Sequence, residues 1–278
     1  MGIFYIDGTF VDENEAVLPV TDLAILRGYA VFDFLRTYNG HPFHLEAHLQ
    51  RLRNSAALIG LRCPWSLEEL SDIVGKTLVQ NDYPESNIRL LITGGDSEDS
   101  ISPGQSPRLL VMVRPVMAHP DIWYEEGIKI ITARLNRYIH GAKSTDYIRA
   151  IVTLKDAEAA GAIESVYVNK DDHVLEGTTS NLFIVRDHTV ISPSEDILPG
   201  ITRDVLIDIL KPDFPVELQP VTRQELLDSD EAFITSSTKE VVPVVQVDDQ
   251  NIADRLPGPV TRKVMELFKN YIDNYGTA

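Results

Sequence analysis

The sequence predicts an α+β protein of two lobes. Two hairpin signals, several strand-like runs and several amphipathic helical segments alternate along the 278 residues, and the pattern breaks once, near residues 117–140. A composition of 44% hydrophobic and 24% charged residues is ordinary for a globular protein. We therefore expect a small N-terminal α+β domain over 1–117, a linker with the first strands of the second lobe over 118–140, and a large C-terminal domain over 141–278.

Local signals organise the first half. The Asp-Gly of "FYIDGTFV" and the Asn-Gly of "VFDFLRTYNGHPFHL" tolerate positive φ, so each stretch predicts a hairpin. Apolar residues at helical spacing from Leu45 predict a helix, and Ser66 with Glu69 forms a capping box for the next one. The runs "NIRLLITGG", "RLLVMVRPV" and "GIKIITARL" then predict three strands.

The second half begins after the loop "RLNRYIHGAK". The helix "TDYIRAIVTLKDAEAAGA" follows it, and then come the short strands "SVYVNK", "HVLEG" and "NLFIV". A helix over "ITRDVLIDIL", the strand "EAFITSS", a strand pair around "VVPVVQVDDQNI" and a closing helix over "PVTRKVMELFKNYI" complete the chain. The second lobe is therefore also expected to be α+β.

Charge and cysteine content exclude several classes of protein. The 42 acidic and 25 basic residues give a formal charge of −17, which repels nucleic acid and anionic membranes. Cys63 is the only cysteine, so one chain can form neither a disulfide nor a cysteine zinc cluster. The start lacks a secretory signal and no apolar run approaches the ~20 residues that span a bilayer. We expect a soluble cytoplasmic protein.

Several motif matches fail. In "HLEAH", His44 and His48 are four residues apart, but Glu46 stands at neither position that a zinc protease needs. The stretch "GAKST" lacks the upstream glycine of a phosphate-binding loop, and the chain contains no G-x-S-x-G or G-x-G-x-x-G. A metal hydrolase or a binding protein remains only as the alternative from another class, and no metal is expected.

Another set of polar features fits together better. Lys143 stands at a loop-to-helix junction, and Glu176 precedes the cluster Gly-Thr-Thr-Ser-Asn. Residues 200–202 begin a helix, where free backbone N–H groups favour a phosphate. The hydroxyl run 235–238 could add donors, and Arg51 a charge-assisted bond. These features amount to one amine, one carboxylate and a phosphate cradle.

This combination resembles the fold-type IV family of pyridoxal-phosphate enzymes, which includes D-amino-acid aminotransferases, branched-chain aminotransferases and aminodeoxychorismate lyases. The resemblance runs in the family's order through "YIDGTFV", "VFDFLRTYNG", "HLQRLRNSA", "KSTDY", "EGTTSN", "LPGITRDV" and "FITSSTKEVVPV". It implies a two-lobed α+β fold with a small N-terminal α/β lobe and a larger, barrel-like C-terminal lobe. It also implies pyridoxal 5'-phosphate as the cofactor, which passes through its pyridoxamine form during turnover.

The resemblance also implies residue roles. Lys143 matches the catalytic Schiff-base lysine, and Glu176 matches the carboxylate that pairs with the pyridine nitrogen. Tyr147 matches the tyrosine that reaches the ring's phenolic oxygen, although its spacing from the lysine is one residue shorter than in branched-chain enzymes. The full set of expected cofactor-binding residues is Arg51, Lys143, Tyr147, Glu176, Leu198, Ile201, Thr202, Ser236 and Ser237.

The substrate assignment is less direct. The motif "EGTTSN" is similar to the E-G-S-S-S-N of D-amino-acid aminotransferases. Those enzymes bind the substrate carboxylate with a tyrosine, an arginine and a histidine, and the matching positions here are Phe32, Gly94 and Asp96. Arg27 and Arg89 offer two other guanidinium groups for a substrate carboxylate. We expect transamination between a D-amino acid and 2-oxoglutarate or pyruvate; the alternatives are a branched-chain L-amino-acid aminotransferase and, third, an aminodeoxychorismate lyase. The resemblance further implies at least a homodimer, in which a second subunit lends loops to the site.

Overall fold

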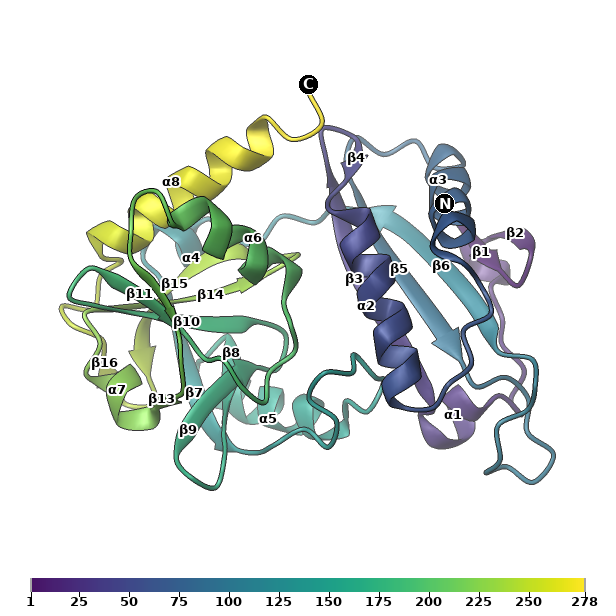
Figure 1. The fold of residues 1–278 in the computed structure, drawn as a ribbon, viewed down its shortest axis with the longest axis horizontal. Helices are drawn as coiled ribbons and strands as arrows, with labels where there is room; N and C mark the ends of the chain where they lie inside the picture. The colour runs from purple at the N-terminus through teal and green to yellow at the C-terminus, as the bar shows by residue number, and fades with distance from the viewer. Residues whose placement is uncertain (1, 278) are drawn as a thin grey trace. The chain divides into compact units, whose positions relative to one another are not determined.

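The computed structural model describes residues 2–277. By internal contacts the chain groups into two compact units: Met1–Met117 with Gly141–Tyr147 and Asn274–Ala278, and Ala118–His140 with Ile148–Asp273 (Figure 1). The segment that carries Lys143 therefore packs with the N-terminal residues, whereas the sequence prediction assigned it to the C-terminal domain. The reason is backbone pairing with an N-terminal strand, in which Ser144 forms a β-bridge with Val31.

The first unit is built on an antiparallel six-stranded sheet. Its strand order is β2-β1-β6-β5-β3-β4. The strands are β1 (Ile3–Ile6), β2 (Thr9–Asp12), β3 (Ala30–Tyr38), β4 (His41–Pro42), β5 (Ser86–Thr93) and β6 (Arg108–Pro115). Both predicted hairpins are confirmed, because Asp7 and Asn39 at their turns have φ of 48° and 52°.

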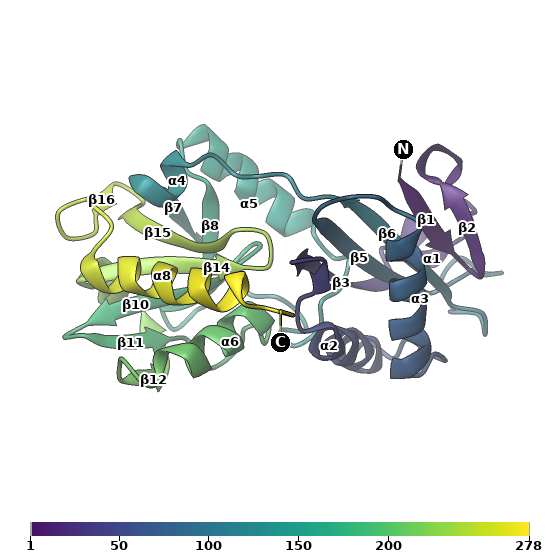
Figure 2. The ribbon, with the colours of Figure 1, turned by 90° about the horizontal axis from the view of Figure 1, so that it is seen from above.

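The helices α2 (Leu45–Leu58) and α3 (Leu67–Val79) cover one face of this sheet. The first unit also contains the short helix α1 (Leu23–Arg27) and the 3-10 helix η1 (Glu13–Glu15) after β2. The predicted capping box is present, since Ser66 and Glu69 exchange side-chain to backbone hydrogen bonds at the start of α3. Leu52 of α2 and Val74 of α3 pack with Leu35, Ile88 and other apolar side chains of the sheet. These contacts form the core of the first unit, and Figure 2 shows α2 and α3 beside the sheet.

The second unit contains a closed six-stranded barrel. Neighbouring strands pair around the ring β10-β14-β15-β7-β8-β9, and β9 returns to β10 through the pair Glu176 and Asn181. The ring strands are β7 (Ile128–Arg134), β8 (Glu164–Val168), β9 (His173–Gly177), β10 (Asn181–Arg186), β14 (Glu231–Ser236) and β15 (Glu240–Val247). The shorter strands β11 (Thr189–Ser192), β12 (Val216–Leu218), β13 (Val221–Thr222) and β16 (Gln250–Asn251) extend the sheet. The barrel-like C-terminal lobe is thus confirmed.

Helices surround the barrel. They are α4 (Ile122–Glu125), α5 (Ile148–Ala159), α6 (Ile201–Leu210), α7 (Arg223–Leu227) and α8 (Pro259–Asp273), and α6 runs beside α8 (Figure 2). The helix α5 begins at Ile148, later than the predicted start in "TDYIRA". Helix α7 was not predicted, although Thr222 and Glu225 form a capping box ahead of it. Short helices of this kind carry too few apolar positions for a periodic signal.

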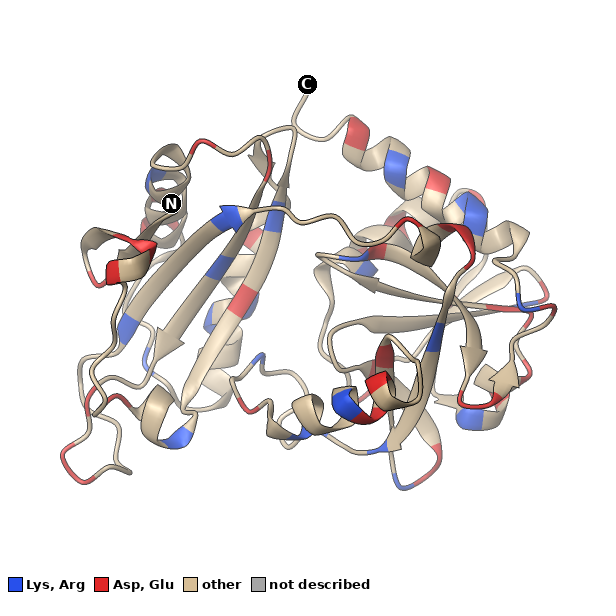
Figure 3. Cartoon of the chain, turned by 180° about the vertical axis from the view of Figure 1, so that it is seen from behind, with Lys and Arg blue, Asp and Glu red and all other residues tan. Residues whose placement is uncertain are grey.

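Acidic residues outnumber basic ones in both units, and Figure 3 marks the two kinds on the ribbon. Among residues 2–277, no helix has the length and the apolar composition needed to cross a bilayer.

Candidate active site

Lys143 is fixed by its backbone beside strand β3. The Lys143 carbonyl accepts a hydrogen bond from the amide of Phe32 at 2.9 Å, and Ser144 forms a β-bridge with Val31. The Lys143 amide in turn donates to the hydroxyl of Ser55 on α2 at 3.0 Å. Lys143 therefore lies on an extended segment paired with β3, not at a helix start, and this pairing delays α5.

The aromatic ring of Phe32 gathers three of the predicted site residues. The Lys143 Nζ lies 4.8 Å from the ring centroid, and the Arg89 guanidinium lies 5.3 Å from it. The Tyr147 ring packs edge-on against the same ring at 5.5 Å. Phe32 is 8% exposed, so this cluster combines two cationic groups with a largely buried aromatic surface. The structure thus brings Lys143, Arg89 and Tyr147 together within the first unit.

Arg51 is held in a buried network on the opposite face of β3. Its Nε donates to Asp33 Oδ2 at 2.9 Å and its Nη2 to Asp33 Oδ1 at 2.7 Å, while His48 Nδ1 lies 2.7 Å from Asp33 Oδ1. Burial alone would raise the pKa of Asp33, but Arg51 and His48 hold it well below the ordinary value. Burial lowers the pKa of His48, which keeps its imidazole neutral. Sequence reasoning missed Asp33 and considered His48 only as a metal ligand, because a single polar residue on a strand or a helix carries no local signal for such a network.

The same network is linked to Lys143 through the main chain of α2. The Ser55 hydroxyl donates to the Arg51 carbonyl at 2.8 Å and accepts from the Lys143 amide. One buried serine therefore fixes the backbone of both Arg51 and Lys143.

In the second unit, Glu176 lies one residue before the end of strand β9, and both of its carboxylate oxygens accept hydrogen bonds. Arg137 Nη1 donates to Oε1 at 3.0 Å, and the Leu198 amide donates to Oε2 at 3.0 Å. Glu176 is 5% exposed, so the ion pair with Arg137 stabilises a nearly buried carboxylate. The structure brings Glu176 and Leu198 into contact as predicted residues, and it adds Arg137, which the sequence analysis did not select.

Asn181 joins this carboxylate to the start of α6. It pairs with Glu176 across β9 and β10 and with Thr235 across β10 and β14, and its Nδ2 donates to the Leu198 carbonyl at 3.1 Å. A Cβ atom on Gly200 would overlap the Asn181 amide oxygen, so this close approach requires glycine. Asn181 therefore sets the distance between β10 and the α6 N-terminus.

The start of α6 fits an anionic group. Gly200 is its N-cap and supplies no side chain to satisfy the first N–H groups, and the Thr202 hydroxyl belongs to a side chain only 4% exposed. Such N–H groups and the positive end of the helix dipole bind phosphate well. Ile201 and Thr202 thus have the chemistry expected of phosphate donors.

The hydroxyl run 235–238 begins with the last two residues of β14 and continues into the tight turn before β15. The Ser236 hydroxyl accepts from the Lys239 amide at 3.1 Å and lies 3.3 Å from the Thr238 hydroxyl, while Ser237 is half-buried in the same turn. The buried hydroxyl of Thr235 has no hydrogen-bond partner among the described residues. An unpartnered buried hydroxyl of this kind is uncommon and suits a polar ligand nearby.

Lys239 reaches from this turn to a buried carboxylate on β8. Its Nζ lies 3.2 Å from Glu164 Oε2 and 2.5 Å from the Thr179 hydroxyl, and Glu164 also accepts from Thr178 and Ser180. Burial opposes the ionisation of Glu164, but Lys239 and the hydroxyl bonds lower its pKa below the ordinary value. Glu164, paired with Lys239, therefore accepts hydrogen bonds from the hydroxyl groups of the cluster "GTTSN". The sequence did not reveal this ion pair.

The positions that replace the D-type carboxylate trap have other partners. A side chain on Gly94 would lie 2.6 Å from the Tyr29 ring, and Asp96 pairs with Arg108 and with the Thr21 hydroxyl. Arg27 ends α1, where its Nη1 donates to the Leu26 carbonyl at 2.8 Å. The structure thus places Arg89 beside Lys143 through Phe32, and it places Arg27 at an exposed helix end.

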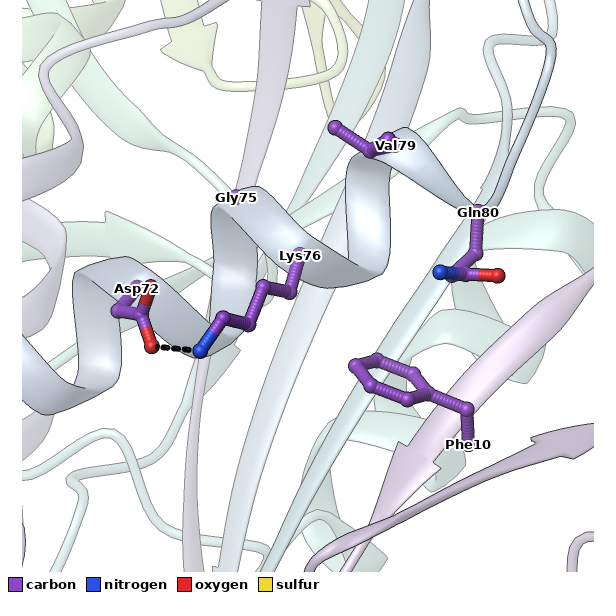
Figure 4. A pocket seen from close by; sticks show the side chains of 6 residues that line it. All are labelled: Phe10, Asp72, Gly75, Lys76, Val79 and Gln80. Atoms are coloured by element: carbon purple, nitrogen blue, oxygen red, sulfur yellow. Dashed lines mark hydrogen bonds and ion pairs between the residues drawn. The ribbon is translucent and has the colours of Figure 1, made fainter.

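A hollow elsewhere in the first unit contains none of the predicted site residues. Phe10 and α3 line it, and Lys76 pairs with Asp72 along its edge at 2.6 Å (Figure 4). The side chains there form a surface depression without convergent polar groups.

Comparison with known proteins defines the family. The family model for class IV amino-transferases matches residues 30–247. A Methanocaldococcus jannaschii protein with a provisional branched-chain-amino-acid aminotransferase name is 33% identical over 282 residues, covering 98% of this chain and 97% of its own. A D-alanine aminotransferase of Bacillus licheniformis is 30% identical over 272 residues, covering 96% and 95%. The solved branched-chain amino acid aminotransferase of Escherichia coli is 27% identical with a TM-score of 0.92, covering 99% and 97%.

The chain therefore belongs to the class IV aminotransferase family. It is a pyridoxal-phosphate-dependent aminotransferase of fold type IV, whose substrates are small amino acids and 2-oxo acids; the solved structures similar to it include one with bound pyridoxamine 5'-phosphate. The predicted fold, enzyme class and cofactor are confirmed. Some relatives are named D-alanine aminotransferases and others branched-chain aminotransferases, so the names do not decide between D- and L-amino acid substrates.

Proposed function

We propose that this enzyme moves an amino group between a D-amino acid and a 2-oxo acid such as 2-oxoglutarate or pyruvate. The observation that carries the proposal is the cluster around Phe32, where an amine and a guanidinium flank one ring at 4.8 and 5.3 Å. A guanidinium in this position can bind the carboxylate of an α-amino acid whose reacting carbon lies near the amine. The similarity of "EGTTSN" to the motif of D-amino-acid aminotransferases and the D-alanine aminotransferase relatives support a D-amino acid as the substrate.

We propose Lys143 as the lysine that binds the cofactor and transfers the proton. The cofactor, when bound, supplies an electron-poor ring that stabilises negative charge at the substrate Cα. Lys143 is half-buried against Phe32, with Arg89 over the same ring, and an amine must shed its proton before it can bind the cofactor. A neutral amine can take the proton from the substrate Cα and later return one.

The remaining predicted residues would bind and orient the cofactor. In this assignment Glu176 accepts a hydrogen bond from the pyridine nitrogen, Leu198 packs on the ring and Tyr147 reaches its phenolic oxygen. The phosphate ligands would be Arg51, the amides of Ile201 and Thr202 with the Thr202 hydroxyl, and the hydroxyls of Ser236 and Ser237. Support comes from the bare N-cap of α6 and from the ion pairs that fix Glu176 to Arg137 and Arg51 to Asp33.

We propose Arg89 and Arg27 as the substrate-carboxylate ligands. A guanidinium can bind a carboxylate through two parallel hydrogen bonds, and Arg89 presents its group beside Lys143. Arg27 is exposed at the end of α1, where it could serve the site of a second subunit. The second candidate function is a branched-chain L-amino-acid aminotransferase, which the names of the M. jannaschii and E. coli proteins favour.

The active form proposed here is at least a homodimer. On α5, Ile148, Ile151 and Val152 are 75%, 52% and 53% exposed and share one helix face. Sedimentation of the holoenzyme measures the assembly state, and a fully active monomer would contradict this part of the proposal. The cytoplasmic location remains a prediction that rests on the single cysteine.

An amino-donor screen tests the function. Paired D- and L-forms of alanine, glutamate and leucine, together with (R)-1-phenylethylamine, are supplied with 2-oxoglutarate or pyruvate, and the chirality of the products is analysed. We expect turnover of D-alanine and D-glutamate, with loss of the yellow absorbance when the donor is added. Activity confined to L-leucine, L-isoleucine and L-valine would establish the branched-chain alternative, and release of pyruvate from aminodeoxychorismate would establish the lyase.

A further inference from the structure

The carboxylate of Glu176 is held on both oxygens by groups of its own unit. Arg137 Nη1 and the Leu198 amide each donate at 3.0 Å, one to each oxygen. A donor on each oxygen fixes the plane of the carboxylate. Glu176 is therefore held in one orientation by Arg137 and the Leu198 amide.

Arg137 is itself fixed, and its anchors lead back to Glu176. The same Nη1 donates to the His140 carbonyl at 3.1 Å, and His140 Nδ1 lies 2.9 Å from Asp196 Oδ1. Asp196 stands two residues before Leu198, whose amide holds the second oxygen of Glu176. The loop before Lys143 and the loop before α6 are therefore joined to each other through His140 and Asp196, and both bind the carboxylate of Glu176.

We propose that Arg137 is a positioning residue for Glu176: it keeps this carboxylate ionised and aims it at the pyridine nitrogen of the cofactor. The inference rests on the proposed role of Glu176 as the partner of that nitrogen. Arg137 contacts neither substrate nor reacting atoms in this assignment.

The physical argument is one of charge and desolvation. Glu176 is 5% exposed, and burial without a counter-charge favours a protonated, neutral carboxyl group. A protonated Glu176 could donate to the pyridine nitrogen but could not keep a proton on it, which the ring needs to accept electrons. The guanidinium at 3.0 Å opposes this loss of charge.

The chain contains a matched control three residues upstream. Arg134 pairs with Asp172 at 2.9 Å, and both side chains are well exposed, at 71% and 48%. Arg134→Gln removes the same charge from the same strand end without touching Glu176. An exposed pair of this kind contributes little to stability.

The experiment compares four variants with the wild-type holoenzyme: Arg137→Gln, Arg137→Lys, Arg134→Gln and Glu176→Gln. The measurements are kcat and KM across pH, the pH dependence of the cofactor absorbance band, and the rate of cofactor release during gel filtration. For Arg137→Gln we expect kcat to fall by about tenfold to a hundredfold, with KM for the amino donor little changed. The acid limbs of kcat and of the absorbance band should both move to higher pH by about one unit.

The other variants define the outcomes. Arg137→Lys should return the acid limb toward the wild-type position, because the charge is restored, while Arg134→Gln should match the wild type. The inference is overturned if Arg137→Gln leaves the acid limb where Arg134→Gln leaves it, or if Arg137→Lys is as impaired as Arg137→Gln. If Glu176→Gln keeps wild-type turnover, the proposed role of Glu176 is wrong. If Glu176→Gln is impaired but Arg137→Gln has the same kcat and acid limb as Arg134→Gln, only the proposed role of Arg137 is wrong.

Discussion

Arg51 and Asp33 form a two-bond ion pair, with Nε and Nη2 at 2.9 and 2.7 Å from the two carboxylate oxygens of a fully buried aspartate. The pair fixes the plane of the guanidinium, so any group that Arg51 binds must approach from one direction. This order is useful for a residue proposed to hold a phosphate. Because both charges are buried, removing either partner would leave the other charge unpaired and desolvated.

Asp33→Asn should therefore impair both stability and cofactor binding. Removing one partner of a buried pair costs about 3–5 kcal/mol, and the released Arg51 loses its orientation. Urea unfolding measures the first effect, and the rate of cofactor release measures the second. The exposed pair of Asp72 and Lys76 supplies the control, since Asp72→Asn should change neither quantity. A cofactor release rate equal in the two variants would argue against the phosphate role of Arg51.

Lys143→Ala should abolish transamination while the fold remains. We expect a change of about 1 kcal/mol or less in the free energy of unfolding, because the hydrogen bonds to Phe32 and Ser55 come from the backbone of Lys143 and survive the substitution. Borohydride treatment of the holoenzyme followed by mass spectrometry tests the covalent link. Lys155→Ala on the exposed side of α5 is the control and should keep full activity. A reducible link that survives in Lys143→Ala would contradict the assignment.

Arg89→Ala should weaken the binding of substrate carboxylates. Hydrogen bonds to a charged group contribute about 1.5–3 kcal/mol, so kcat/KM for a D-amino acid should fall by about tenfold to a hundredfold. The effect on (R)-1-phenylethylamine, which has no carboxylate, should be much smaller. Arg114→Gln on neighbouring β6, whose partner is Glu13, serves as the matched arginine control. Equal losses for the acid and the amine would show that Arg89 supports the fold and not the carboxylate.

Lys239→Met should destabilise the barrel in a pH-dependent way. The folded-state pKa of Glu164 is lowered, so its contribution to stability is present above the ordinary carboxyl range and is lost as the pH falls through the folded value. Without Lys239, burial raises this pKa and the loss begins at higher pH. We expect a cost of about 3–5 kcal/mol near neutral pH, measured by urea unfolding at several pH values.

The double variant Glu164→Gln with Lys239→Met should recover part of that stability, because no unpaired charge remains. The exposed pair of Lys269 and Asp273 is the reference, and Lys269→Met should have little effect. A Lys239→Met protein whose stability shows the wild-type pH dependence would rule out this coupling.

Gly200→Ala should speed cofactor release. The new methyl group overlaps the Asn181 amide, whose displacement breaks its bond to Leu198 and disturbs the amide that holds Glu176. Overpacking of this kind costs about 1–3 kcal/mol. Gly75→Ala in exposed α3 is the contrasting control: nothing lies near its new methyl group, so it should stabilise by about 0.5–1 kcal/mol. Unchanged cofactor release in Gly200→Ala would show that Asn181 has room to move.

Local signals in the sequence were sufficient for many elements. The dipeptides at Asp7 and Asn39 predicted turns with positive φ, and Ser66 with Glu69 predicted the start of α3, because these effects act within a few residues. The start of α5 was misplaced, because the Thr145 amide donates to the Ala30 carbonyl and the chain stays extended. Such a contact between residues far apart in the sequence has no local signature.

The candidate site divides in the same way. By itself the sequence determined the order of the motifs, and with it the family, the cofactor and the residue types for an amine, a carboxylate and a phosphate cradle. Only the tertiary structure decided which partner each group has: Asp33 for Arg51, Phe32 for Lys143, Arg137 for Glu176 and Glu164 for Lys239. The reason is that burial, ion pairing and desolvation depend on distances between residues that the chain brings together only when it folds.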